Sequence, residues 1–148
     1  MDGSTPDLLM AELKRLQAAH ARGAPPYVDR MADLKRLRAA VKAKAEDIVA
    51  ATSADFGRRS RHETLLSDVM TVLHDIDYTL KNLKRWMKPR RVATGWQFLP
   101  GRSEIRYQPV GVVGIISPWN YPVNLALMPL VAALAAGKAL VTANKAMI

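Results

Sequence analysis

A long stretch without charged side chains, from Tyr107 to Gly137, constrains the fold of this chain most. It opens with a β-branched apolar run, Val110 to Ile116, which breaks off in the sequence Pro-Trp-Asn-Tyr-Pro. An Ala- and Leu-rich segment, Val123 to Ala136, follows. A membrane span needs about 20 mostly apolar residues with every backbone group hydrogen-bonded. Prolines and asparagines interrupt this stretch too often for that, so we expect a buried strand, a turn and a helix, and no membrane span.

The residues after this segment predict a second strand. Gly137 is a natural helix end, and Ala139 to Thr142 has the composition of a strand. Strand, helix and strand together form a βαβ unit, in which the crossover is right-handed in nearly all proteins. Ligands of such sheets bind beyond the carboxyl ends of the strands, which is where residues 117–122 fall. Gly111 and Gly114 lie within the first strand, so this segment is not the usual GxGxxG phosphate loop.

The first 90 residues have the pattern of helices. One helix is expected from about Thr5 to Arg22 and a second from about Tyr27 to Thr52. A third starts with a capping-box pattern at Ser60 and Glu63 and ends before Pro89. Its apolar stripe spans only three heptads, which favours packing within the chain over a coiled coil. The stripe consists of Leu66, Val69, Leu73, Ile76, Leu80, Leu83 and Met87.

Residues 91–108 predict a β-hairpin. Val92 to Phe98 and Glu104 to Gln108 read as strands around a Pro-Gly turn at Pro100. An exposed hairpin leaves an unpaired strand edge that needs a partner. We therefore interpret residues 91–108 as an oligomerisation element.

Composition excludes several functions. The 148 residues carry a net charge of +9, but most basic side chains are spread along the helices, so no nucleic-acid partner is expected. No cysteine is present, which excludes disulfides and a thiolate nucleophile from this chain. His62 and His74 have no third ligand in sight, so no metal site is predicted. The polar start of the chain lacks the pattern of a signal peptide, and we expect a cytoplasmic protein.

Residues alone leave the role of the turn open. Trp119 and Tyr121 could plug one end of a domain, with Asn120 satisfying the backbone of the turn. Alternatively, Asn120 sits at a ligand site beyond the first strand.

The segment Pro109-Val-Gly-Val-Val-Gly-Ile-Ile-Ser-Pro-Trp-Asn-Tyr-Pro122, with Pro129-Leu-Val-Ala-Ala-Leu-Ala-Ala-Gly137, resembles the aldehyde dehydrogenase superfamily. The similarity extends over roughly residues 27–137 and is greatest to the branch with coniferyl and fatty aldehyde dehydrogenases. It implies an α/β fold: N-terminal helices (1–90) and a β-hairpin (91–108) lead into the first βαβ unit (109–148) of a Rossmann-like NAD(P)-binding domain, which is incomplete.

The resemblance also implies roles for the turn. The Asn120 amide would donate to the aldehyde oxygen, where thiolate attack builds negative charge. Ile116, Ser117, Pro118 and Trp119 would line the site of NAD or NADP. The family's reaction needs a cysteine nucleophile and a glutamate base, and it oxidises an aldehyde, here of coniferyl type, to the acid. We therefore interpret the chain as an N-terminal piece of such an enzyme, inactive alone and a homodimer at full length.

The end of the chain departs from the family pattern. Ala143 stands where the family has a lysine for the cofactor ribose or its phosphate, and Lys145 comes two residues later. A shift of two residues keeps a side chain on the same strand face but moves it by about 7 Å. Lys145 stays a candidate for cofactor binding. The tail Gly137-Lys-Ala-Leu-Val-Thr-Ala-Asn-Lys-Ala instead resembles homoserine dehydrogenases, which leaves another Rossmann oxidoreductase, or a non-catalytic interaction module, as alternatives.

Overall fold

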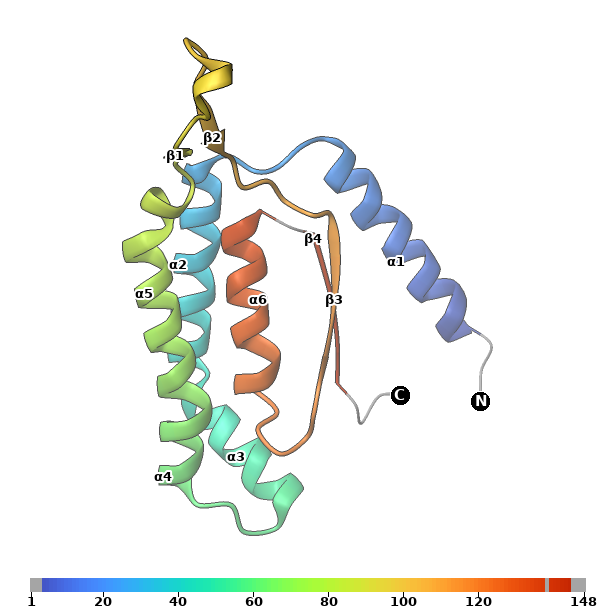
Figure 1. Cartoon of the computed structure of the whole chain (residues 1–148). Coiled ribbons are helices and arrows are strands. Elements are labelled where there is room, and N and C mark those ends of the chain that lie inside the picture. The colour runs from blue at the N-terminus through green and yellow to red at the C-terminus, as the bar shows by residue number, and fades with distance from the viewer. Residues whose placement is uncertain (1–3, 138, 145–148) are drawn as a thin grey trace.

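The computed structural model describes residues 4–137 and 139–144. The described chain is mostly helical with little sheet, and Figure 1 shows helices α2, α5 and α6 side by side, with the strand pair β3–β4 between α6 and α1. The helices are α1 (Ser4–Ala21), α2 (Tyr27–Ala43), α3 (Ala45–Phe56), α4 (Arg61–Thr64), the π-helix η1 (Leu65–Met70), α5 (Thr71–Trp86), the 3-10 helix η2 (Trp96–Phe98) and α6 (Asn124–Ala136). The strands are β1 (Arg90–Val92), β2 (Ser103–Ile105), β3 (Val112–Ser117) and β4 (Ala139–Asn144). No helix in the described residues is long and apolar enough to cross a membrane.

The predicted strand, helix and strand are present. β3 and β4 pair in parallel, from Val112 opposite Ala139 to Ser117 opposite Asn144, and α6 connects them. Gly137 ends α6 in the left-handed conformation, with φ 73°. The side chain of Arg30 approaches this helix end and donates a hydrogen bond of 3.0 Å to the carbonyl of Ala135. Burial lowers the pKa of the Arg30 guanidinium, but a cation suits the negative end of a helix.

The two faces of β3 differ in their cover. Ile115 and Ser117 are buried on the side of α6, at 7% and 1% exposure. Ile116 lies between them in sequence, points to the other face and is 68% exposed. The continuous apolar run predicted cover on both faces. In the part of the chain that the structure describes, α1 covers only the beginning of the second face, near Val112 and Gly114.

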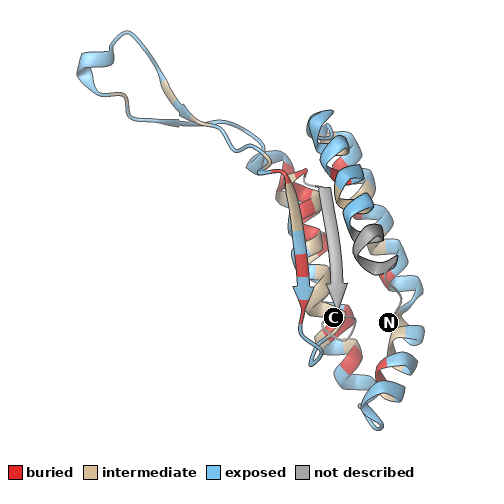
Figure 2. Ribbon diagram, turned by 90° about the vertical axis from the view of Figure 1, so that its right-hand side faces the viewer, coloured by how far each residue is buried: buried red, intermediate tan, exposed pale blue. Residues whose placement is uncertain are grey.

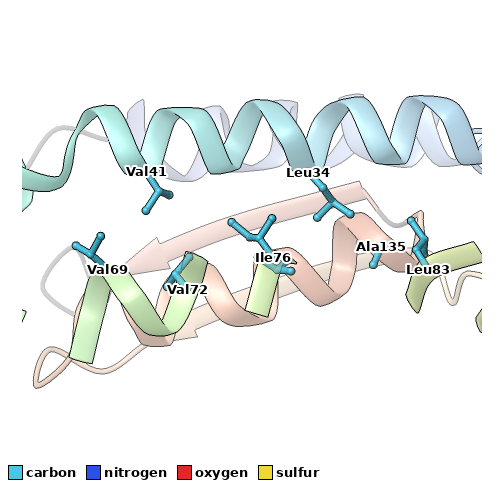
Figure 3. Packing of buried hydrophobic residues seen from close by; sticks show 8 residues of the cluster. Leu34, Val41, Val69, Val72, Ile76, Leu83 and Ala135 are labelled. Carbon is cyan, nitrogen blue, oxygen red and sulfur yellow. The ribbon is translucent and has the colours of Figure 1, made fainter. Parts of the chain in front are cut away.

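The hydrophobic core lies between α2, α5 and α6 (Figure 3). The predicted third helix corresponds to α4, η1 and α5, and its most deeply buried hydrophobic side chains are Val72, Ile76 and Leu83. The predicted stripe is not buried along its full length, since Leu66 is 62% exposed. A π-helical turn at η1 explains the difference, because its wider turn breaks the 3.6-residue register between the residues before and after it. The capping box is also wrong: Ser60 makes no side-chain cap, and Glu63 lies 3.7 Å from Arg59 instead.

The predicted second helix is two helices. Lys44, with φ −95° and ψ 7°, separates α2 from α3. Neither glycine nor proline marks this break, and α3 turns there to pack against α4 and η1. The buried hydroxyls of Thr52 and Thr64 lie 3.2 Å apart across that contact. The break therefore follows from tertiary packing rather than from local sequence.

The hairpin is present but its strands are short. β1 and β2 pair antiparallel, with Arg90 opposite Ile105. The prediction that a strand continues to Phe98 is wrong: residues 96–98 form η2, after Gly95, and the segment is exposed. Figure 2 shows the hairpin projecting from the body of the protein.

A substitution at Gly137 tests the end of α6. A Cβ at this position would lie 2.7 Å from the Arg30 guanidinium, and the φ of 73° is strained for other residues by about 1–2 kcal/mol. Gly57→Ala is the matched control, since φ is 77° there and nothing lies within 4 Å. We expect Gly137→Ala to lower the free energy of unfolding in urea by more than Gly57→Ala. Equal losses would show that Arg30 yields without cost.

Candidate functional site

The turn at residues 118–122 connects the carboxyl end of β3 to α6 and lies next to α3 (Figure 1). Its side chains are open to solvent: Trp119 is 60% exposed, Tyr121 is 36% exposed and Asn120 is exposed. In the described part of the chain, the two aromatic residues therefore do not plug the end of a domain. The turn is instead held from behind by residues of the helical region.

Arg59 is the residue that holds the turn. Its side chain is only 4% exposed. One terminal nitrogen donates to the main-chain oxygen of Asn120 at 2.8 Å, and the other donates to Asp68 at 3.0 Å. The guanidinium also lies 5.0 Å from the ring centroid of Phe56 and 4.9 Å from that of Tyr121, as in cation–π contacts. The bond to Asn120 uses its main chain, so the side-chain amide stays outside this network.

Asp68 connects the same network to α6. This carboxylate is fully buried, and its second oxygen accepts the backbone N–H of Asn124, the first residue of α6, at 2.9 Å. The side chain of Asn124 donates in turn to the carbonyl of Ser67 at 2.8 Å. Helix N-termini leave unpaired N–H groups and a partial positive charge, and a carboxylate satisfies both. Asp68 thus neutralises Arg59 and caps α6 at the same time.

This capping bears on how a dinucleotide would fit. Pyrophosphates often bind at a helix N-terminus, but the N-terminus of α6 is already bonded to the carboxylate of Asp68. The residues suited to a nicotinamide cofactor are therefore those at the end of β3, where Ile116, Pro118 and Trp119 are exposed. Ser117 is 1% exposed, and its buried hydroxyl has no hydrogen-bond partner among the described residues, so only its main chain is available.

A cavity of about 410 Å³ opens beside the turn. Its lining includes Asn120, Tyr121 and three residues of the α3–α4 connection and α4, namely Arg58, Arg59 and Glu63, together with Phe56. Phe56 also lies 5.9 Å from Trp119 between ring centroids. A hydrogen-bond donor, Asn120, is thus placed at the edge of a partly aromatic cavity.

The predicted site residues lie together with one exception. Ile116 to Asn120 form one continuous segment at the end of β3, whereas Lys145 lies outside the described residues. Ala143 pairs with Ile116 across the two strands. Sequence reasoning missed Arg59 and Asp68, because a charged residue at a helix start or on a helix has the same local pattern whether it is solvated or buried. No group of three potential metal ligands occurs in the described residues.

Comparison with known proteins identifies the family that the chain resembles. Residues 13–145 match the model of the "Aldehyde dehydrogenase family". A "Probable coniferyl aldehyde dehydrogenase" of Pseudomonas aeruginosa is 45% identical over 130 residues, which cover 87% of this chain and 27% of that protein. The chain thus spans about a quarter of the length of the curated relatives it matches.

Solved structures of aldehyde dehydrogenases share the fold of this chain. The substrate-bound state of AldH from Staphylococcus aureus superposes with a TM-score of 0.85 at 29% identity, covering 90% of this chain and 29% of that one. Succinic semialdehyde dehydrogenase from Streptococcus pyogenes, in complex with NADP+, has the same fold with a TM-score of 0.84 at 17% identity, covering 99% and 31%.

Removing the carboxylate of Asp68 tests the network. Asp68→Ala removes the close, buried partner of the Arg59 charge and leaves it only Glu63, at 3.7 Å; breaking a buried pair costs about 3–5 kcal/mol of unfolding free energy in comparable cases. Asp77→Ala is the control, since its ion pair with Arg38 is exposed and such pairs contribute about 0.2–1 kcal/mol. Urea unfolding followed by circular dichroism measures both. Similar small losses would contradict a structural role for Asp68.

Proposed function

The chain belongs to the aldehyde dehydrogenase family, and we propose that it forms the N-terminal part of an NAD(P)-dependent enzyme that oxidises an aldehyde to the carboxylic acid. The observation that supports this most is the placement of Asn120, exposed at the end of a parallel strand with its main chain held by Arg59. A neutral amide is a suitable donor to an aldehyde oxygen on which negative charge develops. Preorganised donors of this kind lower the barrier of acyl and aldehyde chemistry by about 3–4 kcal/mol.

The nucleophile has to come from residues other than these 148. The chain contains no cysteine, and the aldehyde carbon needs attack by a thiolate for the family's route. What this chain supplies is the hydrogen bond from Asn120 and a scaffold that holds it. Bound NAD(P) would supply the hydride acceptor.

The end of β3 is the part of this chain that we propose contacts the cofactor. Ile116, Pro118 and Trp119 offer an exposed apolar edge, and Ser117 offers its main chain. The choice between NAD and NADP would depend on residues near the ribose, for which Lys145 is the candidate in this sequence. The pyrophosphate would bind away from α6, whose N-terminus Asp68 occupies.

An aromatic aldehyde of coniferyl type is the substrate class that we propose. The curated relative from Pseudomonas aeruginosa bears that name, and Phe56 and Tyr121 give the cavity beside Asn120 aromatic walls. The family match extends through residue 145. It therefore includes the tail that resembles homoserine dehydrogenases, and we do not propose that second activity. A cytoplasmic enzyme without a nucleic-acid partner fits this function.

We also propose that the projecting hairpin pairs with a second copy of the complete enzyme in a homodimer. Its tip carries Trp96, Phe98 and Leu99 at 84%, 67% and 65% exposure. Solvent-exposed apolar side chains of this size gathered on one loop are typical of an interaction surface. The short strands β1 and β2 leave their outer edges without partners in the described chain.

A graft tests the proposed reaction. Residues 13–145 replace the matching segment of the Pseudomonas aeruginosa relative, and NAD(P)-dependent oxidation of coniferyl aldehyde is followed by the absorbance of NAD(P)H. We expect activity in the graft and none in the isolated chain. Asn120→Ala in the graft should lower kcat by about 10²–10³-fold. Asn82→Ala should not, because Asn82 is half-buried on α5 and donates to the carbonyl of Tyr78 in the same helix. Activity of the isolated chain, or an unchanged kcat of Asn120→Ala, would contradict the proposal.

Sedimentation tests the hairpin. We expect the chain to self-associate at micromolar concentration and the double variant Trp96→Ser, Phe98→Ser to sediment as a monomer, because the apolar tip would be lost. Val28→Ser removes a similarly exposed apolar side chain, 70% exposed on α2, and should change nothing. A stable monomer with residues 91–108 intact would rule out the hairpin as the element of association.

A further inference from the structure

We propose that Arg59 is a positioning residue for the reaction: it fixes the main chain of Asn120 so that the side-chain amide points at the reacting oxygen. This inference rests on the proposed function of Asn120. The two residues are 61 positions apart in sequence, and nothing in the local pattern connects them. Arg59 itself would not touch the reacting atoms, because its bond goes to the main-chain carbonyl of Asn120.

The contacts of Arg59 immobilise the turn from three sides. The guanidinium donates to the carbonyl of Asn120 at 2.8 Å, which fixes the plane of the peptide that follows the candidate donor. It stacks against Tyr121 on one side of Asn120 in the chain. Phe56, which it also contacts, lies against Trp119 on the other side. With the backbone fixed, only the two side-chain torsions of Asn120 remain free.

Asp68 extends this restraint to the end of the turn. It bonds Arg59 with one oxygen and the N–H of Asn124 with the other, at 3.0 and 2.9 Å. The turn is thus held at residue 120 and again at residue 124 by one ion pair. Both charged side chains are nearly or fully buried, at 4% and 0% exposure, so solvent does not loosen the pair.

The burial of this arginine distinguishes it from its neighbours. Arg61 forms an ion pair with Glu46 in which both side chains are more than half exposed, and this pair touches no part of the turn. A buried charge pair often stabilises no more than apolar packing of similar volume. We therefore infer that the role of this pair is to fix one arrangement. Here the fixed arrangement is that of the proposed oxyanion donor, whose effect depends on placement to within about 0.5 Å.

The test uses the graft described above. Arg59→Met roughly keeps the volume of the side chain but removes its hydrogen-bond donors. Arg59→Lys keeps a positive charge but lacks the two terminal N–H groups of the guanidinium. Arg38→Met is the control, at the exposed ion pair with Asp77. We expect Arg59→Met to lower kcat by about tenfold to a hundredfold, with little change in KM, and Arg59→Lys to recover part of that loss. Arg38→Met should retain the kcat of the parent graft.

A double-mutant cycle separates positioning from general destabilisation. If Arg59 acts through Asn120, Arg59→Met causes no further loss of kcat once Asn120→Ala is present. Losses that multiply, or a kcat of Arg59→Met equal to that of the parent graft, would overturn the proposal. An inactive parent graft would count instead against the proposed function.

Proteolysis of the 148-residue chain gives a second readout without activity. Chymotrypsin can cut after the exposed Trp119, whereas the bond after Tyr121 precedes a proline. Arg59→Met should speed cleavage after Trp119 at least about fivefold relative to Arg38→Met, because local opening of the turn becomes easier. Equal rates would overturn the proposal even if the graft is inactive.

Discussion

The ion pair between Arg59 and Asp68 holds the turn after β3 against the start of α6, the region to which we assign the proposed function. Taking two charges out of water costs several kcal/mol per ion, and only close geometry with additional hydrogen bonds compensates for it. Here Arg59 also bonds the carbonyl of Asn120, and Asp68 also bonds the N–H of Asn124. The Nε of Arg59 is buried without a hydrogen-bond partner among the described residues. One interaction therefore joins η1, the turn after β3 and the start of α6. A buried apolar pair could fill the same volume but could not direct a carbonyl and an amide.

The sequence predicts those parts of the fold that depend on local pattern. β3, α6 and β4 follow from an apolar run, an Ala- and Leu-rich segment and Gly137, each readable from nearby residues. The break at Lys44 and the π-helical turn do not follow, because both depend on how α3 and η1 pack against each other. For the site, the sequence predicts a turn at the carboxyl end of the strand, and the family resemblance singles out Asn120. It does not predict Arg59 or Asp68, whose partners lie 61 and 56 residues away.

The second face of β3 is only partly covered in the described residues. A continuously apolar strand is typical of sheets covered on both sides, yet Ile116 is 68% exposed in the described residues. Helix α1 reaches only the first half of this face. The apolar side chains at the end of β3 are therefore open where, in the proposed function, the cofactor would lie. Contact with the cofactor in the proposed function would account for the exposure of Ile116 and Trp119.

The position of Asp68 also decides what α6 can do. In many nucleotide-binding folds the first helix after a strand takes the phosphates on its free N–H groups. That role requires a close backbone approach and an unoccupied positive helix end, and this chain has neither GxGxxG after β3 nor a free N–H at Asn124. The carboxylate of Asp68 would also repel a phosphate. In the proposed function, the hydrogen bond that steadies the turn would thus also keep the pyrophosphate away from this helix. In the proposed function, the strand end would contact the nicotinamide end of the cofactor.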